Sequence, residues 1–309
     1  MKSKISTPVL FIAFNRTDTT QIVFDRIREV QPHKLYIAVD GPRSNKPGEE
    51  DLCQQVVEIT KNVDWDCNAK YLIRDKNLGC KLSVTEAISW VLRYEDMVIV
   101  IEDDVVPAIP FFYFAAELLE RYKDDDRIGM ISGNNYTPIK NMDCDYLFSK
   151  YSHIWGWATW KRAWDKFDVD LPELEETINT DFPSMLFGNK KEKKYFKKYF
   201  KSWFEKIKNR NENAWGPQYL FYMLNNNLLS IVPKTNLASN IGLKSSRTDS
   251  ISKKNKYYWP ANNTFTLTKH PDKVEQNINY DAYHFKKHID RKPPIFNRVF
   301  QKAKIMLKF

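Results

Sequence analysis

The first 135 residues alternate between short apolar runs and amphipathic stretches. Apolar runs of the length and β-branched content typical of buried strands lie at Pro8–Phe14, Lys34–Val39, Ala69–Ile73, Met97–Ile101 and Ile128–Ser132. Apolar positions at helical spacing predict helices over Thr19–Val30, Ser83–Tyr94 and from Pro110 to about Tyr122. Strands that alternate with helices indicate an α/β fold, in which helices cover both faces of a mostly parallel sheet.

The second half of the chain has a different pattern, with more helix signal and more aromatic residues. Residues 172–210 have a largely helical pattern, and Pro217 marks the restart of a helix. Leu228–Val232 is strand-like, and Asn236–Asp249 is a polar loop with one glycine and two cations, Lys244 and Arg247. We expect a helix-rich half with a loop that can cover a diphosphate, and Arg247 is a candidate for contact with that group.

Three consecutive carboxylates, Glu102, Asp103 and Asp104, follow the apolar run Met97–Ile101. Acids at the end of a buried strand are costly unless a cation meets them. One interpretation is a charged turn. The other is a site for Mg²⁺ or Mn²⁺, which favour one or two carboxylates together with phosphate oxygens.

Polar residues also follow the other predicted strands. In α/β sheets, ligands bind beyond the carboxyl ends of the parallel strands. Side chains that follow different strands should therefore gather along one edge of the sheet, and here they are Asn15, Arg16, Asp40, residues 77–81 and the three acids.

The segment His153–Trp160 holds three tryptophans and a glycine in eight residues. Each tryptophan could belong to the hydrophobic core. Three together beside a glycine also suit a platform for a sugar ring, with Trp157 as the candidate contact to the donor.

The net charge of +9 is concentrated in two segments. Lys190–Arg210 and Phe285–Phe309 are strongly basic, so the rest of the 309-residue chain is mildly acidic. Both segments place aromatic and aliphatic residues on one helical stripe. This pattern is typical of a helix packed on the core, and also of a basic helix that binds an anionic membrane surface. No nucleic-acid-binding motif accompanies the charge, so we expect no nucleic-acid partner.

Several classes of protein are excluded by what the sequence lacks. No apolar run is long enough for a membrane span, and the short N-terminal apolar stretch does not fit a signal peptide. The four cysteines have no CxxC spacing, which favours reduced thiols and a cytoplasmic location. No GxGxxG follows the first strand and no P-loop motif occurs, which argues against a dinucleotide dehydrogenase and a P-loop NTPase.

Three blocks of sequence, taken in order, resemble a known family. They are PVLFIAFNR with AVDGPR, then DKNLGC with MVIVIEDDVVP, then HIWGWATWKRAWDKFD with NLASNIG. They resemble bacterial relatives of the N-acetylglucosaminyltransferase I family, which are GT-A-fold nucleotide-sugar glycosyltransferases, from about Pro8 to Ser250. The resemblance implies a GT-A (Rossmann-like) domain over residues 1–270, followed by a basic tail with an amphipathic helix over residues 271–309. Residues 1–135 would bind the nucleotide-sugar, and residues 136–270 would face the acceptor.

The resemblance also implies roles for single residues. Ile12, Arg16 and Lys81 would lie by the nucleotide, and Asp40 would bind uracil. In the acidic block, Glu102 would bind the transferred sugar, Asp103 would contact the ribose or the sugar, and Asp104 would hold Mn²⁺ or Mg²⁺. The implied reaction moves a sugar from a UDP-sugar to a glycan, such as a lipid-linked bacterial surface polysaccharide or lipooligosaccharide, with inversion. The implied location is cytoplasmic, with peripheral attachment to the inner face of the cell membrane.

The chain departs from the family at the position of the general base. Relatives tend to carry Asp directly after the Trp of a WxxQ block, where this chain has Gly216, and often His where it has Asp249. Glu212 or Asp249 could supply the base, or the mechanism could differ, or turnover could be lost. A non-catalytic protein that binds a sugar-nucleotide or glycan is therefore an alternative. A sugar nucleotidyltransferase is another, although the loop AFNRTDTT lacks the glycine usual in that class.

Overall fold

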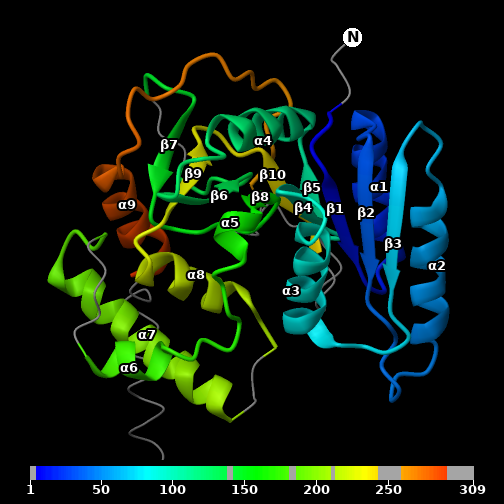
Figure 1. Cartoon of the computed structure of the whole chain (residues 1–309), viewed down its shortest axis with the longest axis horizontal. Helices are drawn as coiled ribbons and strands as arrows, with labels where there is room; N and C mark the ends of the chain where they lie inside the picture. Colours follow the sequence, from blue (N-terminus) through cyan, green and yellow to red (C-terminus); the bar gives the residue numbers. More distant parts are fainter. Residues whose placement is uncertain (1–4, 138–141, 181–185, 210–212, 243–258, 291–309) are drawn as a thin grey trace, which may run out of the picture.

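The computed structural model describes residues 5–137, 142–180, 186–209, 213–242 and 259–290 (Figure 1). It confirms the α/β expectation, because an eight-stranded, mostly parallel central sheet is flanked by helices. A ribbon of two short strands lies beside this sheet.

All strands and helices predicted in the first half are present. The observed elements are β1 (Val9–Ala13), α1 (Thr17–Val30), β2 (Lys34–Val39), α2 (Glu49–Lys61), β3 (Asn68–Ile73), α3 (Gly79–Leu92), β4 (Met97–Glu102), β5 (Val105–Pro107), α4 (Ile109–Arg121) and β6 (Ile128–Ser132). The pattern did not reveal α2 or the three-residue strand β5.

The second half adds shorter elements. They are β7 (Tyr146–Ser149), β8 (Trp157–Trp160), α5 (Lys161–Trp164), α6 (Leu174–Asn179), α7 (Lys190–Lys208), α8 (Gly216–Asn225), β9 (Leu229–Pro233), β10 (Ala238–Asn240), α9 (Ile278–His284) and the π-helical turn η2 (Phe285–Ile289). The predicted helix restart and the strand at Leu228–Val232 are confirmed. Between residues 172 and 209, the described helices are α6 and α7.

The strands of the large sheet follow the order β3-β2-β1-β4-β8-β6-β9-β7. Strands β1 to β4 run parallel, whereas β8 runs antiparallel between β4 and β6, and β7 runs antiparallel to β9. Because β8 is reversed, its amino end meets the carboxyl ends of β4 and β6. Strands β5 and β10 form the two-stranded ribbon.

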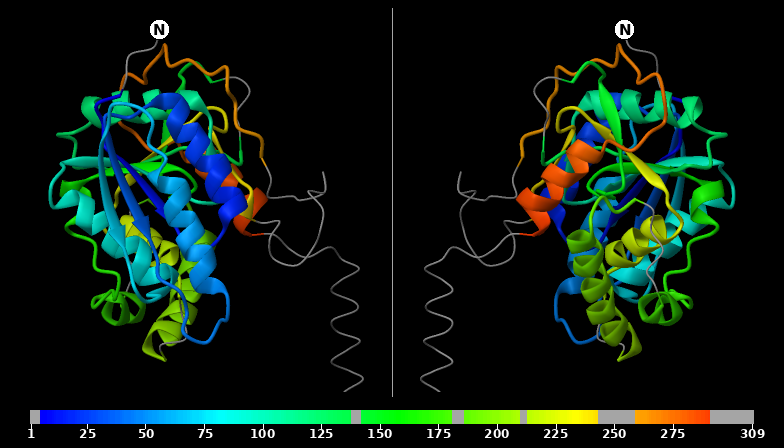
Figure 2. Two further views of the ribbon diagram at one scale, coloured as in Figure 1. Left: turned by 90° about the vertical axis from the view of Figure 1, so that its right-hand side faces the viewer. Right: turned by 90° about the vertical axis from the view of Figure 1, so that its left-hand side faces the viewer.

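Strand β1 contributes to a hydrophobic core on both faces of the sheet. Val9 and Phe11 pack with α1, α2 and α4, while Leu10 and Ile12 pack with α3 and α8. Figure 2 shows α1 and α2 side by side over the first face. Burial on both faces explains why β1 is apolar throughout rather than alternating.

The aromatic stripe of α7 packs on the protein. Phe196 and Phe200 are buried in a third cluster with α6, α8 and η2, and the lysines occupy the outer face. The first part of the predicted tail also packs on the body, since Tyr280 and Asp281 of α9 are buried. The remaining predicted tail, residues 291–309, lies outside the described residues.

Among the described residues, no helix combines the length and the apolar character needed to cross a bilayer.

Candidate functional site

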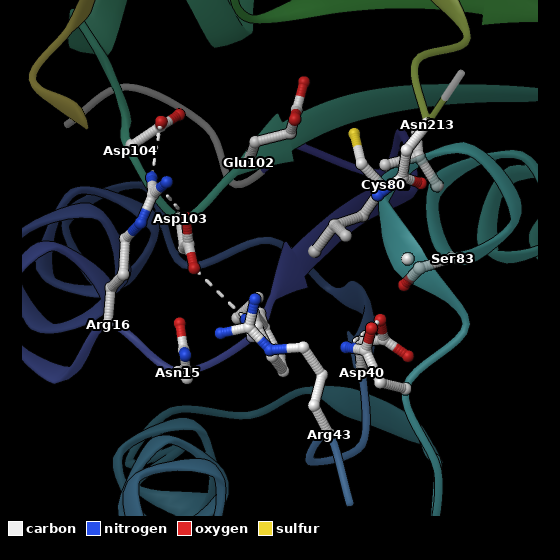
Figure 3. A pocket seen from close by; sticks show the side chains of 16 residues that line it. Asn15, Arg16, Asp40, Arg43, Cys80, Ser83, Glu102, Asp103, Asp104 and Asn213 are labelled. Atoms are coloured by element: carbon white, nitrogen blue, oxygen red, sulfur yellow. Dashed lines mark hydrogen bonds and ion pairs between the residues drawn. The ribbon is translucent and has the colours of Figure 1, made fainter. Parts of the chain in front are cut away.

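A cavity of about 450 Å³ lies beyond the carboxyl ends of β1, β2 and β4 (Figure 3). The structure therefore brings together the polar side chains that follow separate strands, as the sequence predicted. The lining residues are Ile12, Ala13, Phe14, Asn15, Arg16, Asp40, Arg43, Asn77, Gly79, Cys80, Ser83, Val84, Glu102, Asp103, Asp104 and Asn213. Six of the predicted site residues are among them.

The three acids form one wall of the cavity. Glu102 is the last residue of β4, and Asp103 accepts a hydrogen bond from the backbone N–H of Phe14 (3.1 Å). Burial, reinforced by the neighbouring acids, raises the pKa of Glu102 to about 8 and that of Asp103 to about 7. Three ionised carboxylates in this wall would repel one another, so the wall favours the binding of a cation.

Arg16 supplies one such cation. Its Nη1 lies 2.7 Å from Asp104 Oδ2 and 3.7 Å from Asp103 Oδ1. Burial opposes its charge, but the attraction of these two acids prevails and raises the pKa of the guanidinium. The Arg16 side chain is 40% exposed, so it can reach a ligand in the cavity without being unpacked from the core.

Asp40 holds the floor of the cavity together. Its carboxylate accepts hydrogen bonds from the backbone N–H groups of Gly41 and Leu78 (both 3.0 Å) and from Asn77 Nδ2 (2.9 Å). Burial raises the pKa of Asp40 despite these bonds. A Cβ on Gly41 would lie 2.4 Å from the backbone N of Lys76, so glycine is required where the two loops touch.

Arg43 and Asn213 are among the lining residues that the sequence did not predict. Arg43 Nε bonds to the Glu49 carboxylate (2.9 Å), and its guanidinium lies 5.5 Å from the centre of the Phe14 ring. Asn213 Oδ1 accepts a hydrogen bond from the backbone N–H of Lys81 (3.2 Å) at the first turn of α3. Arg43 belongs to the AVDGPR block that follows β2, which could have identified it. Asn213 comes from a loop that is distant in the sequence, and no sequence pattern identified it as a site residue.

The structure does not bring Lys81 and Trp157 into the cavity. Lys81 Nζ lies 3.2 Å from Asp170 Oδ1, and Lys81 is not among the lining residues. Trp157 is completely buried in the central strand β8 and stacks on Trp215, with ring centroids 5.4 Å apart. The tryptophan-rich segment is thus largely core, because its second half forms a strand between β4 and β6.

The loop predicted to cover the site begins beside Asp104. Strand β10 pairs with β5, and Ile241 N–H donates to the backbone oxygen of Asp104 (2.8 Å). Asn240 Nδ2 donates to Asp104 Oδ1 (3.3 Å), and a Cβ added to Gly242 would lie 2.0 Å from Asp104 Oδ2. The other predicted residues of this loop, Arg247 and Asp249, lie outside the described residues.

Gly216, where the resemblance would place Asp, lies near the tryptophan-rich segment. Gly216 begins α8, and a Cβ there would lie 3.0 Å from Ile154 Cδ1. Glu212 lies outside the described residues, although the next residue, Asn213, lines the cavity. The roles of Glu212 and Asp249 as bases therefore stay predictions.

The site has the donor types that Mg²⁺ and Mn²⁺ prefer. Within the described residues, no group of three or more His, Cys, Asp or Glu is arranged to hold a metal ion alone. A divalent ion that uses one or two carboxylates would complete its ligands with phosphate oxygens and water, which fits a wall made of Glu102, Asp103 and Asp104.

Two comparisons with known proteins returned no relative. No protein-family model matches the chain, and no curated protein matches it.

Proposed function

We propose that the chain is a GT-A-fold glycosyltransferase that transfers a sugar from a UDP-sugar to a glycan acceptor. The observation that best supports this proposal is the lining of one cavity by Arg16, the amino end of α3 and the acids Glu102–Asp104. Cations and helix amino ends favour a diphosphate, whereas carboxylates favour sugar hydroxyls and a divalent ion. A nucleotide-sugar contains all of these partners in one molecule.

In this proposal, each lining residue would contact a different part of the nucleotide-sugar donor. Ile12 and Asp40 would lie around the base, and Arg16 would pair with the diphosphate. Glu102 would accept hydrogen bonds from the transferred sugar, and Asp103 from the ribose or the sugar. Asp104 would hold Mn²⁺ or Mg²⁺, which, when bound, neutralises charge on the departing diphosphate. Arg16 contributes to the same neutralisation as a fixed positive charge.

An inverting transfer also needs a base for the acceptor hydroxyl. We propose Glu212 or Asp249 for this role, because Gly216 cannot carry it. Glu212→Gln and Asp249→Asn should be assayed separately for transfer and for UDP binding. One of them should lower transfer by about 100-fold or more with UDP affinity retained. Wild-type transfer in both would exclude the two candidates.

We further propose that the acceptor is a lipid-linked glycan at the inner face of the cell membrane, part of a surface polysaccharide or lipooligosaccharide. The exposed lysines of α7 support this proposal, because they would attract anionic lipids. The enzyme would then work in the cytoplasm as a peripheral membrane protein.

A non-catalytic protein that binds a sugar-nucleotide is a second candidate. Gly216, at the position where relatives tend to carry Asp, favours it, because glycine has no group that can accept a proton. Both candidates use the same cavity, so binding alone cannot separate them.

The test measures UDP release from a panel of UDP-sugars with and without Mn²⁺. Metal-dependent release is expected, and Asp104→Asn should lower it by roughly 100-fold or more. Asp126→Asn, at a side chain that is 76% exposed, serves as the matched control and should leave release unchanged. Binding without release would favour the binding protein, and pyrophosphate formed from UTP would favour a nucleotidyltransferase. Absence of UDP binding would overturn the proposal.

A further inference from the structure

Four aromatic residues, each partly exposed, form a second feature at the carboxyl edge of the sheet. We name Tyr136, Trp155, Trp259 and His288 the aromatic cluster. The ring centroids of Tyr136 lie 5.3 Å from Trp155 and 6.2 Å from His288, and those of Trp259 and His288 lie 6.5 Å apart. The four residues come from separate parts of the chain, so the fold itself assembles the cluster.

The strand register places the aromatic cluster on the same edge of the sheet as the cavity proposed to bind the nucleotide-sugar donor. Trp157 of β8 is opposite Val100 of β4 and Ser132 of β6. Because β8 is antiparallel to both, Trp155 precedes β8 at the edge where Glu102 ends β4. Tyr136 follows the carboxyl end of β6 at this edge. The cavity therefore lies on the β2, β1 and β4 side, and the aromatic cluster on the β8 and β6 side.

The ribbon of β5 and β10 joins the two sites. A Cβ on Gly156 would lie 3.0 Å from Ala238 Cβ and 3.5 Å from Val105 Cγ1, so the segment carrying Trp155 packs on this ribbon. The backbone oxygen of Trp259 accepts a hydrogen bond from Ser239 Oγ (2.7 Å) in β10. Asp104 directly precedes the other ribbon strand, and the aromatic cluster is thereby fixed next to the acid wall.

A buried polar group packs against one ring of the cluster, that of Tyr136. The imidazole of His153 is 7% exposed, and its centroid lies 5.0 Å from the Tyr136 ring. Its Nε2 has no hydrogen-bond partner among the described residues. An unsatisfied buried polar atom costs about 1–3 kcal/mol, so its presence in a native structure calls for an explanation, of which a functional role is one. A cluster that served only as core would favour an apolar residue here.

We propose that the aromatic cluster binds a pyranose ring of the acceptor glycan. This inference rests on the proposed function and extends it to the acceptor. Aromatic faces pack against the apolar C–H face of a sugar, while Tyr hydroxyl and Trp N–H groups at their edges bond to its hydroxyls. The cavity already provides charged partners for a nucleotide diphosphate. The neighbouring cluster of rings therefore fits the neutral partner of the reaction.

The test uses leucine variants and a panel of neutral disaccharides: lactose, cellobiose, maltose and chitobiose. Binding is measured by saturation-transfer NMR with UDP and Mn²⁺ present, and UDP affinity is measured by calorimetry. At least one disaccharide should bind the wild-type chain. Trp155→Leu and Trp259→Leu should each weaken that binding by tenfold or more and leave UDP affinity within twofold. Trp203→Leu, at a partly exposed ring on α7, is the matched control and should change neither.

The outcomes separate this inference from the proposed function. If UDP binds but no disaccharide binds the wild-type chain, or if both variants keep wild-type disaccharide affinity, the acceptor subsite is wrong and the donor site stands. If UDP does not bind the wild-type chain, the proposed function itself fails. Thermal unfolding of each variant within about 5 °C of wild type establishes that loss of binding does not reflect loss of fold.

Discussion

Gly242 packs so closely against the Asp104 side chain that a Cβ atom at position 242 would not fit. A Cβ at position 242 would lie 2.0 Å from Asp104 Oδ2, well inside van der Waals contact. Gly242→Ala must therefore move the carboxylate that we propose as the metal ligand. We expect about tenfold weaker UDP binding in the presence of Mn²⁺, measured by calorimetry, with a smaller effect when Mn²⁺ is absent.

Gly188→Ala is the matched control for this change. The nearest atom to a Cβ at position 188 is Ile278 Cγ2 at 3.8 Å, which is an ordinary contact. UDP affinity should therefore be unchanged in this variant. Equal metal-dependent UDP affinity in Gly242→Ala and wild type would contradict the proposed role of Asp104.

The buried imidazole of His153 makes stability depend on pH. Burial lowers its pKa from 6.5 to about 3. Between these values the unfolded chain binds a proton that the folded chain does not, so the folded state loses stability as the pH falls below 6.5. The loss is about 1.4 kcal/mol per pH unit. His153→Phe removes the titrating group and the unsatisfied nitrogen, and should gain stability over wild type as the solution is acidified.

Urea unfolding of both proteins at pH 7.5 and pH 5.0 measures this effect. The difference between variant and wild type isolates His153 from carboxyls such as Asp281, whose raised pKa acts in the opposite direction. A stability difference that is independent of pH would contradict the lowered pKa, because it would show that His153 binds protons equally in the folded and unfolded chains.

At the residue scale, the sequence predicted which charged residues line the cavity better than it predicted which aromatic residues do. Asp104 and Arg16 were predictable, because polar residues that follow parallel strands meet at one edge. Trp157 was not, because a tryptophan in a strand can face a ligand or a core, and the choice depends on which strands flank it. Asn213 was unpredictable for a further reason, since a loop-to-loop contact leaves no periodic pattern.

At the element scale, the missed helix α2 shows the same limit. It is amphipathic, but its buried face is made mainly of Cys53, Val56, Val57 and Thr60, which give a weak apolar signal. Strand β8 was hidden because three tryptophans in eight residues look like a binding motif. Its reversed direction follows from tertiary pairing with β4 and β6, which local sequence does not encode.

A buried ion pair joins the residue that follows β7 to α7. Lys150 Nζ lies 2.8 Å from Glu192 Oε2, and these side chains are 2% and 1% exposed. Lys150→Met should lower the free energy of unfolding by roughly 3–5 kcal/mol, because it leaves a carboxylate buried without its counterion. Urea denaturation measures the change.

The double variant Lys150→Met with Glu192→Gln tests the cause. It removes both charges, and the amide oxygen of Gln can still accept the hydrogen bond that the Tyr151 hydroxyl donates to Glu192. Much of the lost stability should return. A double variant as unstable as the single one would show that packing around the Lys150 side chain, rather than charge, dominates.

At the scale of the whole molecule, lysines on the outer face of α7 are exposed among the described residues and can meet an anionic surface, because the aromatic stripe of this helix packs inward. Replacing the exposed Lys194, Lys198 and Lys201 with Gln should weaken binding to vesicles that contain phosphatidylglycerol. At about 1 kcal/mol for each lysine, the loss is on the order of 100-fold. Co-sedimentation with vesicles measures it.

Two controls accompany this measurement. Vesicles of pure phosphatidylcholine should bind neither protein, since they carry no net charge. A chain that ends at residue 291 tests the contribution of the second basic segment. If the lysine variant and the shortened chain both bind anionic vesicles as wild type does, neither segment is a membrane anchor.

The position of β8 in the sheet has a consequence for how the chain folds while it is being synthesised. The ribosome synthesises β1 to β4 first, yet one edge of β4 pairs with a strand that ends at residue 160. Until that strand emerges, the apolar residues Val98–Ile101 present an open edge in the nascent chain, a known target for chaperones and for aggregation. The three acids of the proposed donor site thus lie at the end of a strand whose last neighbour is synthesised only when about half of the protein has been translated.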